Sequence, residues 1–228
     1  MIQPAYLETF LRKTLGVDPG SQVADELRKL ASTINVQRGC MAPIDHSRAM
    51  LVYVAHGATK LVASASRDRE QIVAFHFGGD LISVPENGLH AFGLTALIES
   101  TLIVFPLNAM IDCAQGERSV MRLLLERAQT ALYRCRDKAV GLGRKNAQER
   151  LAAFLIGMTE RIESVQDDSC VIDLPMSRRD IGDSLGLTIE TVSRQFSELR
   201  NAGLIETEGR SRVLLRDPGA LARRAGHI

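Results

Sequence analysis

Two short helical patterns separated by a glycine, at residues 177–199, constrain this chain more than any other stretch. In the first pattern, Ile181 and Leu185 recur at helical spacing until Gly186 interrupts them. Glycine readily adopts the left-handed backbone that lets two helices meet at a steep angle. Thr188 then offers a side-chain oxygen that can cap the free backbone N–H groups of a second helix. The stretch therefore predicts a helix-turn-helix.

The second helix is expected to bury one face and expose the other. Its apolar positions recur at intervals of three, four and three, namely Ile189, Val192, Phe196 and Leu199. The opposite face carries Glu190, Ser193, Arg194 and Ser197. Arginine can donate two hydrogen bonds to guanine, glutamate can accept from cytosine, and serine can bond several base edges. The first three of these residues lie near the N-terminal end of the helix, which enters the major groove in helix-turn-helix docking. An exposed face with a Glu190–Arg194 ion pair, worth a few tenths of a kcal/mol, is the alternative interpretation.

At these positions the chain contains RDIG at 179–182, LGLT at 185–188 and ETVSR at 190–194. These motifs resemble the helix-turn-helix of the CRP/FNR superfamily of bacterial transcription regulators, and the Glu-x-x-Ser-Arg pattern resembles its FNR and FixK-type branch. The resemblance implies that each arm of a TTGAT…ATCAA palindrome is read by three side chains. Arg194 would take the guanine, Glu190 the cytosine paired to it, and Ser193 a neighbouring thymine.

The pattern of residues 1–33 predicts a short helical lead. Between residues 34 and 111 the pattern of apolar residues is different. Short apolar runs bounded by Gly, Pro and Asp follow one another there: MLVYVAHG, TKLVASAS, QIVAFHFGGD, LISVPENG and ALIESTLIVFP. Such runs favour an antiparallel sandwich or barrel. The family resemblance implies a cyclic-nucleotide-binding-type β-roll.

The predicted roll lacks the residues that a cyclic nucleotide requires. In the family, an acidic residue after a glycine holds the ribose and an arginine holds the cyclic phosphate. Asp80 follows Gly79, but no Arg or Lys occurs between Arg69 and Arg118. A buried phosphodiester without a cationic partner costs several kcal/mol. We therefore interpret the nucleotide site as lost.

Metal and cluster sites are not indicated either. The four cysteines are Cys40, Cys113, Cys135 and Cys170, and they form no CxxC pair. The family's oxygen-sensing members hold an iron–sulfur cluster with a group of N-terminal cysteines, whereas no cysteine precedes Cys40 here. In the predicted roll His46, His56, His76 and His90 form no HxH or HxxxH spacing. We expect no cofactor and no bound metal. A regulator of the same architecture that senses a ligand, haem or an oxidant directly, through Cys135 or Cys170 in the last case, stays open as an alternative.

The longest helical pattern runs over residues 116–143 and keeps close to a seven-residue repeat. We expect its apolar seam to meet a second copy of the chain through Met121, Leu124, Leu125, Ala128, Leu132, Cys135 and Ala139. A helix that packs only within its own chain is the alternative. The glycines of GLG at 141–143 indicate a hinge. The predicted domains are residues 1–115, a dimerisation helix at 116–143, and residues 144–228.

After the recognition helix, residues 204–207 and 212–215 flank a polar turn and predict a hairpin of the winged-helix type. Candidates for contacts to the DNA backbone are Arg178, Arg179, Thr188, Thr191, Arg210 and Arg212. Backbone contacts fix the register of a protein on DNA without specifying sequence. Each of the four arginines is equally compatible with a solvated surface.

Composition adds only limits, because 28 Lys and Arg face 27 Asp and Glu. With no apolar run of membrane length and no signal-peptide core, we expect a cytoplasmic protein. The combined expectation is an α+β homodimer with a roll, a long helix and a winged helix-turn-helix, which binds double-stranded DNA. The resemblance implies an activator that contacts RNA polymerase at genes for microaerobic or anaerobic respiration or for nitrogen fixation. The sequence does not indicate an enzyme. A cupin-like metalloenzyme is the enzyme alternative that stays open.

Overall fold

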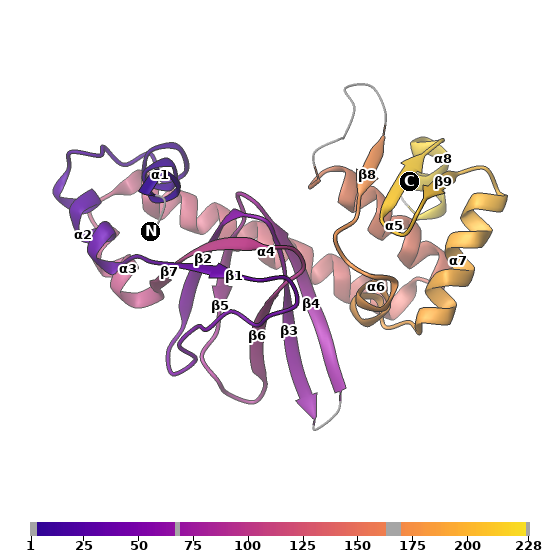
Figure 1. The fold of residues 1–228 in the computed structure, drawn as a ribbon, viewed down its shortest axis with the longest axis horizontal. Coiled ribbons are helices and arrows are strands. Elements are labelled where there is room, and N and C mark those ends of the chain that lie inside the picture. Colours follow the sequence, from indigo (N-terminus) through magenta and orange to yellow (C-terminus); the bar gives the residue numbers. More distant parts are fainter. Residues whose placement is uncertain (1–3, 67–68, 163–169, 227–228) are drawn as a thin grey trace. The chain divides into compact units, whose positions relative to one another are not determined.

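A computed structural model of the chain describes residues 4–66, 69–162 and 170–226. The chain divides into two compact units, residues 1–134 and 135–228. Each unit contains both helices and antiparallel strands, which confirms the predicted α+β class (Figure 1). The boundary between the units falls inside the long helix, so the division at residues 115 and 143 stays a prediction.

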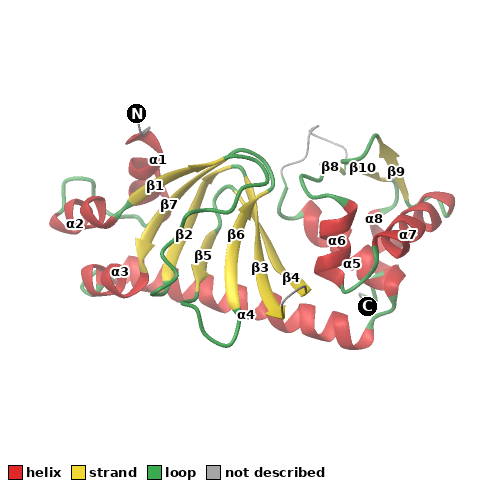
Figure 2. Ribbon diagram, turned by 60° about the horizontal axis from the view of Figure 1, so that its bottom comes forward, coloured by secondary structure: helices red, strands yellow, loops and turns green. Residues whose placement is uncertain are grey.

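The first unit is built on two antiparallel sheets (Figure 2). Their strands are β1 (Ser32–Val36), β2 (Met50–His56), β3 (Ala58–Ser66), β4 (Arg69–Phe77), β5 (Leu81–Val84), β6 (Ala91–Ala96) and β7 (Ser100–Pro106). One sheet has the order β1-β7-β2-β5 and the other has the order β4-β3-β6. Inward residues of both sheets, such as Val52, Leu102, Leu61 and Leu94, form one buried cluster. The predicted antiparallel sandwich or barrel is therefore confirmed.

The sequence pattern missed strand β6, because no predicted run covered residues 89–95. Gly93 interrupts the strand where its alternation of apolar side chains would have been read. A Cβ atom at Gly93 would lie 3.3 Å from Sδ and Cε of Met41, whose backbone bridges to Thr95. A glycine inside a strand commonly marks such a close approach.

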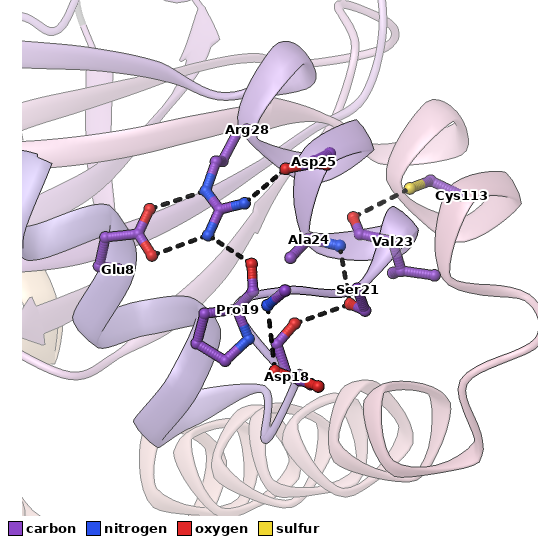
Figure 3. A network of polar contacts seen from close by, with 10 residues as sticks. Glu8, Asp18, Pro19, Ser21, Val23, Ala24, Asp25, Arg28 and Cys113 are labelled. Atoms are coloured by element: carbon purple, nitrogen blue, oxygen red, sulfur yellow. Dashed lines mark hydrogen bonds and ion pairs between the residues drawn. The ribbon is translucent and has the colours of Figure 1, made fainter.

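The predicted helical lead forms α1 (Pro4–Thr9), η1 (Phe10–Thr14) and α2 (Gln22–Leu30), and α3 (Leu107–Ala114) follows the last strand. Phe10, Leu11 and Leu27 are fully buried against Tyr53 and Phe105 of the first sheet. A polar network ties the lead together, as Figure 3 shows. The guanidinium of Arg28 donates to Glu8 at 2.8 and 2.9 Å, to Asp25 at 2.7 Å and to the Pro19 carbonyl at 2.9 Å.

Helix α4 (Arg118–Arg144) is 27 residues long, which corresponds to about 40 Å. Near its start Val120 is fully buried, and Leu123 and Leu124 pack against the same cluster as the helical lead. The glycines at residues 141–143 lie inside α4, which continues to Arg144, and the hinge that they indicate stays a prediction. Glycine lowers helix propensity by about 1 kcal/mol but does not forbid a helical backbone.

The second unit contains α5 (Ala147–Thr159), β8 (Val171–Asp173), α6 (Arg178–Leu185), α7 (Ile189–Asn201), β9 (Ile205–Glu208), β10 (Arg212–Leu215) and α8 (Pro218–Arg224). The predicted hairpin is β9 and β10, and β8 adds a third strand in the order β8-β10-β9. Leu151 and Leu155 of α5 are fully buried. Within the ranges that the structure describes, no helix has the length and apolar character required to cross a membrane.

Candidate nucleic-acid interface

In the second unit, helix α6 of the helix-turn-helix begins and ends at the capping residues that the sequence predicts. Ser177 begins α6 with a capping box, in which its hydroxyl accepts from the Asp180 N–H and the Asp180 carboxylate accepts from the Ser177 N–H at 2.8 Å. Gly186 ends α6 with a φ of 65°, a left-handed backbone angle that residues with a side chain rarely adopt. The predicted break at this glycine is confirmed.

A second glycine of the motif is required by packing and not by its backbone angle. A Cβ atom at Gly182 would lie 2.6 Å from the carbonyl oxygen of Leu187. The same turn is held by a hydrogen bond from the Leu187 N–H to the Gly182 carbonyl at 3.0 Å. Only glycine allows α6 and the chain that enters α7 to come this close.

Recognition helix α7 is capped and oriented largely as predicted. The Thr188 hydroxyl accepts from the Thr191 N–H at 3.2 Å, and Val192, Phe196 and Leu199 are buried. Ile189 does not line the buried face, because its side chain is 40% exposed. On a helix with 3.6 residues per turn it lies at the edge of the apolar sector, away from its centre.

The three predicted base-reading side chains all lie exposed on the first two turns of α7. The Ser193 hydroxyl donates to the Ile189 carbonyl at 2.8 Å, which leaves its oxygen free to accept. The pKa of the Glu190 carboxyl is lowered by its own backbone N–H, then by the Thr188 side chain, with a smaller contribution from the charge of Arg179. Glu190 therefore stays ionised at neutral pH, as an acceptor must.

Arg194 has an ionic partner, but not the one that the alternative interpretation proposed. Its Nε lies 3.8 Å from Oε1 of Glu198, one turn further along α7. The two side chains are 66% and 46% exposed, and the distance exceeds that of a hydrogen bond, so the pair holds the guanidinium only weakly. The terminal fork of Arg194 can therefore still donate to a guanine edge.

Arg178 is placed differently from the other backbone candidates. Its guanidinium carbon lies 3.1 Å from the ring centroid of Phe196, and burial lowers its pKa to about 10. Nη1 is buried and has no hydrogen-bond partner among the residues that the structure describes. Arg178 thus packs α6 on α7, while Arg179 is exposed on the same helix.

The wing places its two arginines on and beside a tight turn. Gly209 has a φ of 63° there, and Arg210 next to it is exposed. Arg212 at the start of β10 pairs with Glu208 at 3.3 Å. Arg200, which was not among the predicted site residues, follows Ser193 by two turns on the exposed side of α7. Its guanidinium contacts the Thr207 hydroxyl in β9 at 3.4 Å and so joins the recognition helix to the wing.

The long helix α4 exposes an apolar stripe. Leu125, Leu132, Tyr133 and Val140 are 60, 50, 68 and 58% exposed, and the last two were not among the predicted contacts. Of the predicted residues, Ala128, Cys135 and Ala139 are also exposed, Met121 is half-buried, and Leu124 is partly covered by its own unit. The exposed members keep the alternating spacing of four and three residues that an apolar seam requires.

In the β-roll, Asp80, the acidic residue of the nucleotide site that we interpret as lost, stabilises the turn in which it lies. Asp80 accepts from the Phe77 N–H at 2.9 Å and lies 3.8 Å from the His76 ring. Cys113 donates its thiol to Glu26 at 3.4 Å, and burial followed by this carboxylate raises its pKa to about 11. Among the residues that the structure describes, no group of three His, Cys, Asp or Glu side chains is placed to hold a metal ion.

These observations define a winged helix-turn-helix protein, and comparisons with known proteins agree. Residues 149–224 match the Crp-like helix-turn-helix domain. The nitrogen fixation regulation protein FixK of Rhizobium meliloti (strain 1021) is 38% identical over 168 residues, which are 74% of each chain. FixK of Bradyrhizobium diazoefficiens is 38% identical over 152 residues, which are 67% of this chain but only 64% of that protein.

A solved structure supports the same assignment. FixK2 from Bradyrhizobium japonicum matches with a TM-score of 0.74 and 31% identity, over 85% of this chain and 96% of that chain. The chain therefore belongs to the CRP/FNR family and is a DNA-binding transcription regulator of the FixK type, not an enzyme.

Proposed function

We propose that this regulator acts in the cytoplasm as a homodimer that binds a TTGAT…ATCAA-type palindrome and activates transcription through RNA polymerase. The proposal rests above all on the exposure of Glu190, Ser193 and Arg194 on the first two turns of a fully built recognition helix. In this arrangement Arg194 donates to guanine, Glu190 accepts from the paired cytosine, and Ser193 contacts a neighbouring thymine. Because relatives at 38% identity bear the name nitrogen fixation regulation protein, its targets are genes for nitrogen fixation or for microaerobic and anaerobic respiration.

Dimerisation follows from the chemistry of α4 and from the needs of the site. Leu125 and Leu132 are exposed one heptad apart on the apolar stripe of α4. A second copy of the chain supplies an identical stripe, as a two-fold interface requires. One recognition helix covers only a few base pairs, whereas two helices read half-sites about one helical turn apart.

Fluorescence anisotropy on the palindrome and on a scrambled duplex tests the proposal. Protein without added ligand should bind the palindrome selectively, and sedimentation should give two chains per duplex. Arg194→Ala should cost about 1–3 kcal/mol on the palindrome and relax selection at the guanine.

Arg210→Ala is the matched control, because it removes the same charge from the wing. It should weaken binding to both duplexes alike and flatten the dependence of affinity on salt. Base reading by Arg194 is refuted if Arg194→Ala weakens both duplexes equally. The dimer is refuted if one chain occupies the full palindrome.

A further inference from the structure

One arginine in the second unit contacts the ends of two helices at once. Arg150, on the first turn of α5, donates from Nη2 to the Leu142 carbonyl at 2.8 Å and from Nε to the Lys145 carbonyl at 2.8 Å. Leu142 lies in the last turn of α4, and Lys145 directly follows the helix. From Nη1 it donates to the Leu185 carbonyl at 3.0 Å, and Leu185 is the last residue of α6.

These three acceptors are groups that a helix leaves unsatisfied. The last four carbonyls of an α-helix have no partner within it, and a cation there also interacts favourably with the helix dipole. On its own helix Arg150 lies near the N-terminal end, where a positive charge is unfavourable. Its side chain therefore serves α4 and α6, and the planar guanidinium is the group whose geometry can satisfy three fixed carbonyls.

A further hydrogen bond joins the same helices, and the turn after α6 lies close to the end of α4. Lys138 of α4 donates to the Ser184 hydroxyl of α6 at 3.1 Å, and Ser184 is buried. Beside it, a Cβ atom at Gly186 would lie 3.5 Å from Cδ2 of Leu142. The end of α4 therefore packs directly on the turn that leads into the recognition helix.

We propose that Arg150 is a positioning residue that fixes the recognition helix to the end of α4. This inference rests on the proposed function, since α4 is there the dimer helix. If the two α4 helices of a dimer meet at the two-fold axis, a rigid joint sets the separation of the two recognition helices. Arg150 then determines which spacing between half-sites the dimer accepts, although it touches no base.

Arg150→Lys tests this role because it keeps the charge but loses the planar fork. Three duplexes are compared by anisotropy: the palindrome, the palindrome with one base pair added between its arms, and a single half-site. One added base pair turns one arm by about a tenth of a helical turn relative to the other. Arg12→Gln, an exposed position in the first unit, is the control for the loss of one arginine.

Wild-type protein should discriminate against the added base pair. Arg150→Lys should bind the palindrome about tenfold more weakly, because a loose joint lowers the effective concentration of the second helix at its site. Its penalty for the added base pair should shrink, while its half-site affinity should match that of the wild type. Equal spacing penalties in both proteins, or a parallel loss on the half-site, would overturn the inference.

A second measurement needs no DNA and separates this inference from the proposed function. Backbone amide exchange is followed at Lys145, whose N–H donates to the Gly141 carbonyl at 3.0 Å. It should become about tenfold faster in Arg150→Lys, because the end of α4 opens locally, and should not change in Arg12→Gln. Unchanged exchange at Lys145 in Arg150→Lys would reject the role of Arg150, whether or not the wild type binds the palindrome. If the wild type does not bind the palindrome selectively but amide exchange at Lys145 is faster in Arg150→Lys, only the proposed function is rejected.

Discussion

One glycine in the middle of α6 and one in the last turn of α5 allow the same substitution to be compared in opposite surroundings. Gly182 and Gly157 are both helical and neither has a positive φ. Alanine at Gly182 would place Cβ 2.6 Å from the Leu187 carbonyl oxygen, whereas alanine at Gly157 would meet nothing within 4 Å. The backbone angles are therefore controlled, and only the packing differs.

The expected magnitudes follow from these distances. Replacing a helical glycine by alanine gains up to about 1 kcal/mol when space is available. At Gly182 the obstacle is a backbone carbonyl, which cannot rotate away as a side chain can. Overpacking of this kind costs about 1–3 kcal/mol, and we expect the upper end of that range. Gly182→Ala should therefore lower the free energy of unfolding by about 2 kcal/mol after the propensity gain.

Urea unfolding followed by far-ultraviolet circular dichroism measures both variants, with Gly157→Ala expected to be slightly more stable than the wild type. Gly182→Ala should also weaken binding to the palindrome, because the carbonyl that must move belongs to the turn before α7. If Gly182→Ala proves as stable as Gly157→Ala and binds DNA as the wild type does, the argument from close approach is wrong.

Two further predictions follow from buried ionisable groups. Burial lowers the pKa of Lys138 from 10.5 to about 8, so between these values the unfolded chain holds more protons than the folded one. The free energy of unfolding should rise with pH by up to about 1.4 kcal/mol per pH unit between about pH 8 and 9, below the range in which Cys113 acts in the opposite direction, and Lys138→Met should abolish this rise in denaturation experiments. The Cys113 thiol, whose pKa is raised from 9.0 to about 11, should react with iodoacetamide about a hundredfold more slowly than an unperturbed thiol. Comparable labelling of Cys113 and exposed Cys40 in peptide mass spectra would contradict this.

The sequence alone determined the features of the site that depend on neighbours a few residues away. The cap at Thr188 and the left-handed Gly186 are satisfied by backbone groups within one turn. Local signals of this kind can be read without the fold. The outward direction of Glu190, Ser193 and Arg194 also follows from helical periodicity, once one face is known to be apolar.

Periodicity failed where an element ends or where a distant group intervenes. It predicted a buried Ile189, although the side chain is 40% exposed, because spacing does not show where the covered sector of a helix ends. Spacing also does not show which side chain will bind the last carbonyls of α4. Arg178 shows the same limit, since a sequence cannot distinguish an arginine stacked on Phe196 from one that faces solvent.

What only the tertiary structure decided is which distant groups share a contact. Arg150 is 35 residues from the Leu185 carbonyl in α6, and the sequence analysis gave it no role. Arg200 reaches the wing in the same way, and Gly182 is required because Leu187 passes close to it. A sequence fixes caps, turns and apolar faces through local backbone chemistry, whereas the partner of a long polar side chain is fixed only when packing brings separate helices together.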